Sequence, residues 1–214
     1  MVRITVLGGT GYAGSHIAKE AAARGHDVLA VSRKAPEDPV EGVSYVSGDV
    51  LDEGFLKDLA AKSDLLMLAL SPRGDMQGRV IEAARTLIPV AAAAGVRVGV
   101  IGGAGALRVS EGGPRLIDTE DFPEEIKPES FEMLDVLEAL QASEDSLDWF
   151  YIHPAAGFGS FHPGERRGAY RVGGEVLLSD REGKSEISGA DFALAILDEI
   201  EKPVHRRRRF SAAY

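Results

Sequence analysis

The sequence opens with a short apolar run, VRITVL, that leads directly into the glycine-rich stretch GGTGYAG at residues 8–14. Gly9, Gly11 and Gly14 have the G-x-G-x-x-G spacing, and Gly8 gives the same stretch a second, G-x-x-G-x-x-G spacing. A strand, such a glycine turn and a following helix are typical of a dinucleotide-binding sheet, because glycines allow a tight turn and a close approach of the backbone to a pyrophosphate. The alternative is a tight strand-to-helix turn that holds no ligand.

The helix expected after this turn supplies the groups that would hold the phosphates. Its first N–H groups have no partner within the helix, and they lie at the positive end of the helix dipole. Thr10 adds a hydroxyl group to the same turn. We therefore predict that a dinucleotide is bound here by Gly8, Gly9, Thr10, Gly11, Tyr12, Ala13 and Gly14.

Apolar segments of strand length alternate with segments of helical spacing, which is typical of βαβ units that form a parallel sheet. The expected strands cover residues 2–7, 27–32, 43–47, 64–70, 96–101 and 147–152. The expected helices cover residues 12–24, 55–62, 77–94 and 131–141. Pro89 is expected to kink or split the third helix, because proline removes a backbone donor. Residues 1–214 are accordingly predicted to be a single Rossmann-like α/β domain with a doubly wound parallel sheet.

The pattern changes beyond Pro154, where glycine, proline and aromatic residues predominate. Residues 154–187 are predicted to form a small C-terminal substrate-side lobe with a hairpin at residues 169–178. Ser188, with Asp191 three residues later, is typical of the start of a final helix, which is expected to end near residue 200.

The residues after the second expected strand decide which dinucleotide fits. A carboxylate at this position holds a ribose 2′-hydroxyl, whereas a cation holds a 2′-phosphate. The sequence here is VSRKAP, in which Arg33 and Lys34 precede any acidic residue. Because a guanidinium pairs well with phosphate, we predict NADP(H) in preference to NAD(H). The alternative is an exposed basic turn without a binding role.

The carboxyl ends of the other strands are expected to line the ligand crevice. Asp49 and Val50 stand where adenine would lie, although Asp49 is equally well explained as a helix cap. Leu70, Ser71, Gly103 and Pro154 follow the fourth, fifth and sixth strands. Ser71 and His153 are the candidates for a catalytic role, with a packed or solvent-facing histidine as the alternative for His153.

Several catalytic patterns are absent from the sequence. None of the five tyrosines is followed by lysine four residues later, so the Tyr-x-x-x-Lys acid of a standard short-chain alcohol dehydrogenase is missing. There is no cysteine, no HExxH pattern and no Gly-x-Ser-x-Gly pattern, so we predict neither a metal site nor acyl transfer.

Charge and hydropathy limit the partners that we expect. The 34 Asp and Glu residues outnumber the 24 Lys and Arg residues, and the net charge of −10 argues against binding to nucleic acid. The run Arg206–Arg209 is expected to be a solvated charge group on an edge strand. No segment approaches the about 20 apolar residues of a membrane helix. We predict a cytoplasmic monomer or homodimer that binds neither nucleic acid nor membrane.

Four segments resemble a known group: GGTGYAGSHIAKEAAARGHDVLAVSR, VIGGAGAL, LDWFYIHPAAGF and ISGADFALAILDEIEKPVHRRRRFSAAY. They are similar to the NmrA-like, atypical short-chain dehydrogenase/reductase group described as NAD(P)H-flavin reductases, and to the related biliverdin IX-beta reductase. The resemblance implies NADPH along the strand ends and hydride transfer to a flavin or a similar ring. The flavin would be a substrate rather than a tightly bound cofactor.

The leading hypothesis is an NADPH-dependent oxidoreductase that transfers hydride to a flavin or quinone-like acceptor without a Tyr-x-x-x-Lys acid. The alternative is an NADP(H)-binding redox sensor with little or no turnover. Phe158, Phe161 and Tyr170 would cover a flat acceptor or form a small satellite core. Arg166 and Arg167 are candidates to meet a flavin phosphate.

Overall fold

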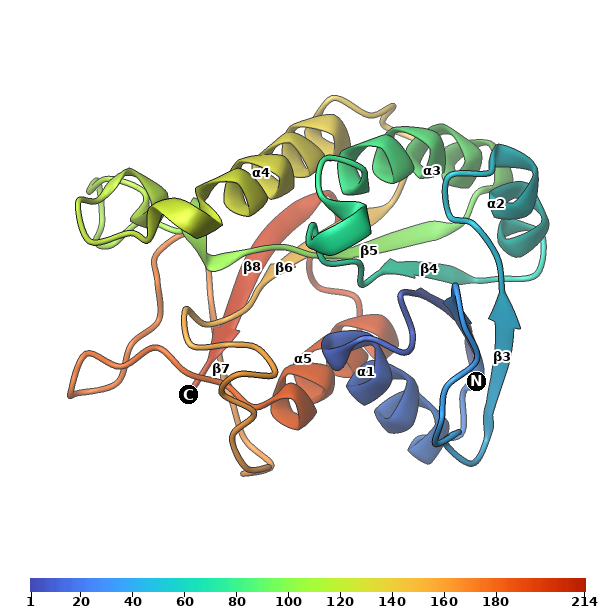
Figure 1. Cartoon of the computed structure of the whole chain (residues 1–214), viewed down its shortest axis with the longest axis horizontal. Coiled ribbons are helices and arrows are strands. Elements are labelled where there is room, and N and C mark those ends of the chain that lie inside the picture. The colour runs from blue at the N-terminus through green and yellow to red at the C-terminus, as the bar shows by residue number, and fades with distance from the viewer.

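The computed structural model describes all 214 residues as one α/β domain, in which a sheet separates two helical layers. Figure 1 shows α2, α3 and α4 on one face and α1 and α5 on the other. The strands are β1 (Arg3–Leu7), β2 (Asp27–Ser32), β3 (Val43–Ser47), β4 (Leu65–Leu68), β5 (Arg97–Ile101), β6 (Trp149–His153), β7 (Arg171–Gly173) and β8 (Arg208–Ala213). The α-helices are α1 (Tyr12–Ala23), α2 (Glu53–Ala60), α3 (Val80–Ala94), α4 (Lys127–Gln141) and α5 (Gly189–Glu201).

The strand order is β3-β2-β1-β4-β5-β6-β8-β7. The chain adds β2 and β3 on one side of β1 and then crosses to add β4 on its other side, so the order of the strands reverses beside β1. All neighbouring strands are parallel except β7, which runs antiparallel to β8. In such a sheet, the crevice for a ligand lies outside the carboxyl ends of the strands at the point of reversal. The fold therefore directs a ligand to the turn after β1, as expected from the sequence.

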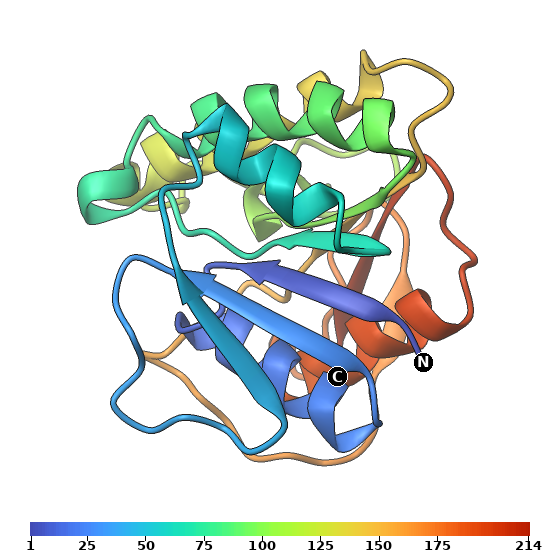
Figure 2. The same ribbon diagram turned by 90° about the vertical axis from the view of Figure 1, so that its right-hand side faces the viewer.

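Helices cover both faces of the sheet, as Figure 2 shows from the side. One apolar cluster lies beneath α2, α3 and α4, and a second of similar size lies beneath α1 and α5. Strand β4, LLML, is fully buried because it faces both clusters. This burial explains why its sequence is a continuous apolar run rather than an alternating one.

Pro89 lies inside α3, which is one helix rather than two, so of the two predicted effects the split does not occur. The proline itself is exposed, whereas its neighbour Val90 is buried in the core. Water can therefore satisfy the backbone carbonyl that proline leaves without a donor, while the opposite face of the helix stays packed on the core.

The predicted hairpin at residues 169–178 is also wrong. Strand β7 pairs with β8 through Val172 and Ala212, and Val176 forms a separate bridge with Arg108. The lobe is thus attached to the edge of the main sheet rather than paired with itself. Strand β8 lies between β6 and β7 and is not an edge strand, which corrects the expectation for the arginine run.

Two of the four arginines, Arg207 and Arg209, are less solvated than expected, whereas Arg206 and Arg208 are exposed. Arg207 donates to the carbonyls of Ser143, Glu144 and Leu147 in the loop after α4, and Arg209 pairs with Glu175. The final helix begins as predicted, since the Ser188 hydroxyl accepts a hydrogen bond from the Asp191 N–H.

Candidate nucleotide site

The turn after β1 is held by the neighbouring strand β2. The N–H groups of Gly8 and Gly9 both donate to the carbonyl of Val31, at 2.9 and 3.0 Å. The N–H of Gly11 then donates to the carbonyl of Gly8 at 3.0 Å, which closes the turn. Gly8 has a φ of +89°, a conformation that side chains with a Cβ rarely adopt. These bonds form a compact main-chain loop at the carboxyl edge of the sheet.

Side chains are excluded from this loop by close backbone contacts. A Cβ on Gly14 would lie 2.2 Å from the carbonyl oxygen of Gly8, and a Cβ on Gly9 would lie 2.6 Å from the Cβ of Ala30. A Cβ on Gly11 would lie 3.3 Å from the same Gly8 oxygen. Since real Cβ atoms do not approach another atom as closely as in the first two cases, the loop requires glycine at Gly9 and Gly14. The residues present thus fit a cradle for a phosphate group.

Helix α1 begins in this cradle. Its N-cap residue, Gly11, has no side chain that could accept from the first-turn N–H groups of Tyr12 and Ala13. No acidic side chain stands in the first turn either. These N–H groups and the positive end of the helix dipole are therefore available to an anion. Thr10 is exposed beside them, so its hydroxyl is accessible from solvent.

Tyr12 connects the cradle to the C-terminal lobe. Its hydroxyl accepts from the N–H of Gly189 at 3.0 Å and donates to the carbonyl of Pro163 at 3.1 Å. Its ring lies edge-on to Phe158, with 5.4 Å between the ring centroids. The main chain of Tyr12 thus belongs to the cradle, while its side chain anchors the lobe. The sequence indicated only the first of these roles.

Arg33 follows β2, as predicted, but its guanidinium already has a partner. Nη1 of Arg33 lies 2.9 Å from Oδ2 of Asp75, which belongs to a short 3-10 helix, η1 (Gly74–Met76), after β4. Lys34 is exposed and makes no ion pair. Sequence reasoning missed Asp75, although its place after a strand that flanks β1 was a usable signal.

Asp49 and Val50 lie after β3. The Asp49 carboxylate accepts from the N–H of Leu51, and Asp52 rather than Asp49 caps helix α2. The helix-cap explanation of Asp49 is therefore wrong. Val50 is buried in the core, 8% exposed, so only a small part of its side chain can face a ligand.

The residues at the ends of β4, β5 and β6 differ in exposure. Leu70 lies against the cradle, with Cδ2 3.1 Å from the position of a Cβ on Gly8, and Ser71 is exposed. A Cβ on Gly103 would meet no atom within 4 Å, so there is open space above this residue. Pro154 is buried. The main chain at Gly103 therefore borders open space.

His153 lies in the interior rather than at the crevice edge, which corrects the position expected from the sequence. The side chain is 0% exposed, and its Nδ1–H donates to the carbonyl of Gly103 at 2.8 Å. Burial lowers the pKa of His153 to about 4, so the ring is neutral at pH 7. The packed alternative matches the structure, and His153 supports the loop at Gly103 without reaching the crevice.

The aromatic side chains of the lobe occupy different positions. Phe158 packs on Phe192, with 4.6 Å between ring centroids, so it belongs to a satellite core. The Tyr170 hydroxyl donates to Asp198 of α5, and this hydrogen bond and burial raise its pKa. Phe161 is 68% exposed. Of the three candidates to cover an acceptor, only Phe161 is free to do so.

The two lobe arginines are engaged in contacts within the protein. Arg166 pairs with Glu20 at 3.0 Å, and the guanidinium of Arg167 stacks on Tyr214 at 3.7 Å from the ring centre. A role in binding a flavin phosphate would require each arginine to leave its partner.

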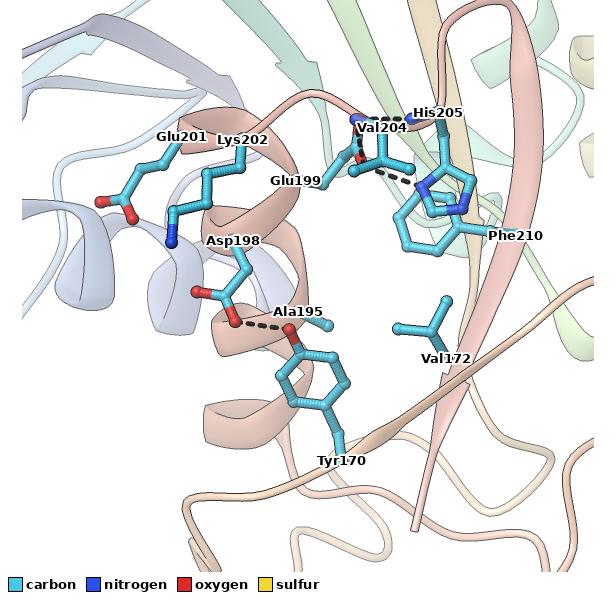
Figure 3. A pocket seen from close by; sticks show the side chains of 10 residues that line it. All are labelled: Tyr170, Val172, Ala195, Asp198, Glu199, Glu201, Lys202, Val204, His205 and Phe210. Carbon is cyan, nitrogen blue, oxygen red and sulfur yellow. Dashed lines mark hydrogen bonds and ion pairs between the residues drawn. The ribbon is translucent and has the colours of Figure 1, made fainter.

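A concave pocket of about 500 Å³ lies away from the cradle, between α5 and the amino-terminal half of β8. Figure 3 shows two pairs among its polar side chains, Tyr170 with Asp198 and Glu199 with His205. It contains none of the predicted nucleotide-binding residues. No group of three or more His, Asp or Glu side chains is placed to hold a metal ion. None of the helices combines the length and the apolar character that a membrane span requires.

Comparisons with known proteins agree with the glycine cradle. A family model described as NAD(P)H-binding matches residues 8–203, so the chain belongs to the NAD(P)H-binding family. Its fold and its glycine turn are those of a Rossmann protein that binds a nicotinamide dinucleotide.

Three solved structures are similar over essentially the whole chain. A putative exported protein from Burkholderia pseudomallei is 39% identical with a TM-score of 0.88, and 100% of each chain is covered. A putative NADH-flavin reductase from Streptococcus pneumoniae is 32% identical with a TM-score of 0.84, covering 100% of this chain and 99% of that one. A putative epimerase from Bacteroides thetaiotaomicron is 32% identical with a TM-score of 0.88, covering 100% and 98%.

Proposed function

We propose that the protein is an NADPH-dependent reductase that transfers hydride to a flavin or quinone-like ring. The observation that carries this proposal is the combination of a glycine cradle that excludes side chains with open space above Gly103 on the same edge of the sheet. The similarity to the Streptococcus pneumoniae protein, named for NADH-flavin reduction, supports a flat acceptor.

The residues present would bind and orient rather than supply a strong acid. The first-turn N–H groups of α1 would hold the diphosphate, and Arg33 with Lys34 would hold the 2′-phosphate. A bound nicotinamide supplies a hydride, which is two electrons and one proton. The second proton needed for a two-electron reduction would come from water, because no Tyr-x-x-x-Lys pair is present. Orientation of two flat rings would therefore provide most of the rate.

The acceptor side would be lined by Ser71, Gly103 and the exposed Phe161. Ser71 is the remaining candidate for a hydrogen bond to the acceptor, since His153 is buried. Phe161 would cover one face of the acceptor ring, which excludes water and aligns the reacting atoms.

A redox sensor is the second candidate function, and the burial of His153 favours it. Without an accessible acid, the protein would bind NADP(H) and signal its redox state with little turnover. The monomer or homodimer state and the cytoplasmic location remain predictions.

The deciding experiment is steady-state oxidation of NADPH, followed by its absorbance, with FMN, FAD and quinones as acceptors. The proposal predicts acceptor-dependent oxidation that saturates with both substrates. Tight NADPH binding without any acceptor-dependent oxidation would contradict the reductase and leave the sensor.

A further inference from the structure

The ion pair between Arg33 and Asp75 joins the two strands that flank the cradle. Arg33 follows β2 and Asp75 follows β4, and both strands are hydrogen-bonded to β1. The pair therefore connects the carboxyl ends of strands on either side of the glycine turn. The side chains are 64% and 84% exposed, so solvent and solutes reach both partners.

We infer that Asp75 sets the preference for phosphorylated over unphosphorylated dinucleotide by competing with the 2′-phosphate for the guanidinium of Arg33. This inference rests on the proposed binding of NADP(H). A carboxylate and a phosphate accept the same charge-assisted hydrogen bonds from a guanidinium. A 2′-phosphate must displace Asp75 and then lies near its negative charge, whereas the 2′-hydroxyl of NADH does neither. Asp75 is thus a specificity-determining residue that weakens NADPH binding selectively.

The pair is built so that a phosphate can open it. Exposed ion pairs contribute little to stability, because water competes for both charges. Gly74 and Gly78 flank Asp75 with φ of +56° and +75°, and a Cβ on either would meet no atom within 4 Å. The backbone on both sides of Asp75 therefore borders open space.

The other charges of this segment are paired separately. Arg73 pairs with Glu129 at 2.7 Å and Arg79 with Glu82 at 3.4 Å, so neither competes for Asp75. Lys34, next to Arg33, makes no ion pair and would add to the attraction for a phosphate. Release of Arg33 from Asp75 therefore leaves two adjacent cations at the end of β2.

The test compares Asp75→Asn with the native chain by titration calorimetry, using 2′,5′-ADP, 5′-AMP, NADPH and NADH. We expect Asp75→Asn to tighten binding of 2′,5′-ADP and NADPH about three- to tenfold, from loss of the competing pair and of the like-charge repulsion. Binding of 5′-AMP and NADH should change less than about twofold.

Asp145→Asn is the charge-matched control. Asp145 is fully exposed, lies 3.5 Å from Arg207, and belongs to the loop before β6, at the opposite edge of the sheet. Its substitution removes one negative charge without touching Arg33, so the ratio of NADPH to NADH affinity should stay unchanged. An equal effect of both substitutions would mean that only net charge matters, and would overturn the role of Asp75.

Arg33→Ala separates this inference from the function on which it rests. If Arg33→Ala lowers the NADPH preference while Asp75→Asn does not raise it, the role of Asp75 is wrong and the 2′-phosphate site stands. If Arg33→Ala leaves the preference unchanged, the 2′-phosphate site itself is wrong. The gain from Asp75→Asn should be smaller in the Arg33→Ala background, and an equal gain there would contradict competition for Arg33.

Discussion

The two halves of the crevice are built in different ways. The phosphate half is made of main chain, since Gly8, Gly9 and Gly11 are joined to one another and to β2 by backbone hydrogen bonds. The proposed acceptor half depends in part on side chains of a lobe that is attached through Tyr12 and through the pairing of β7 with β8. In the first half, a side chain introduced by substitution would collide with neighbouring atoms of the turn. In the second half, a substitution would remove contacts between side chains that already have partners.

The two proposed halves of the site therefore depend on different kinds of group. A main-chain cradle can bind a diphosphate whatever side chains surround it. A site made of side chains depends on which of them remain free, and the lobe uses Arg166, Arg167, Phe158 and Tyr170 for its own packing. Experiments on each half should therefore give effects of different size and kind.

The largest effect is expected in the cradle. Gly14→Ala places a Cβ 2.2 Å from the Gly8 carbonyl oxygen, so the turn must move. We expect a loss of NADPH affinity of about 100-fold or more and a loss of about 1–3 kcal/mol in the free energy of unfolding. Calorimetric titration and urea denaturation would measure the two.

Gly174→Ala is the control for the cradle substitution, because a Cβ there meets no atom within 4 Å. It should change the NADPH affinity less than about twofold. If Gly14→Ala changed the NADPH affinity as little as Gly174→Ala, the turn would tolerate a side chain at Gly14. That result would contradict the rigid main-chain cradle.

The next effect concerns His153, whose buried ring holds the loop at Gly103, and the pH dependence of stability that it causes. The pKa of His153 is about 4 in the folded protein, below the ordinary value of 6.5, so the unfolded chain takes up the proton first as the pH falls. Stability should therefore fall between pH 6.5 and pH 4, by about 3 kcal/mol at most from this group, and this contribution should be fully present above pH 6.5.

His153→Gln replaces the imidazole N–H donor with an amide N–H donor that does not titrate. The substitution should therefore flatten this part of the pH profile of the urea midpoint. The half-buried His16, whose pKa burial also lowers, should retain its own contribution in both proteins. An unchanged slope in His153→Gln would contradict the neutral buried state of His153.

A smaller effect is expected on the acceptor side. Phe161→Ala removes the exposed ring of the lobe, and we expect the KM for FMN or a quinone to rise about tenfold with the Kd for NADPH unchanged. Steady-state kinetics and a binding titration would separate the two. An equal change of both constants would show that the halves of the crevice are not independent.

The smallest effect is expected at the connection between the halves. Tyr12→Phe removes the hydroxyl that accepts from Gly189 and donates to Pro163, at a cost of about 1 kcal/mol in stability. Hydrogen exchange should increase at residues 157–168, while NADPH affinity should change less than about twofold, because the main chain of Tyr12 remains. A large loss of affinity would show that the lobe positions the cradle.

The sequence predicted most of the sheet because its signals are local. The bounds of β2 and β3 agree with the expected ones, and the glycine turn lies where its spacing placed it. In each case, adjacent residues determine the conformation, through strand alternation or through the steric limits on glycine. Helix ends differed by a few residues, since α4 begins at Lys127 before its apolar periodicity starts.

Contacts between distant residues could not be predicted from the sequence. Glu132 of α4 accepts from the N–H groups of Gly78, Val80 and Ile81 and so caps α3 from another helix. The pairing of Arg33 with Asp75 and of β7 with β8 is of the same kind. No local pattern records these partners, so the side-chain contacts of the lobe could not be predicted from the sequence.

Titration calorimetry of the native protein with NADPH tests the central claim most directly. The account predicts saturable binding at one site per chain, lost in Gly14→Ala and kept in Gly174→Ala. The absence of saturable heat with both NADPH and NADH, from protein shown to be folded by circular dichroism, would contradict it.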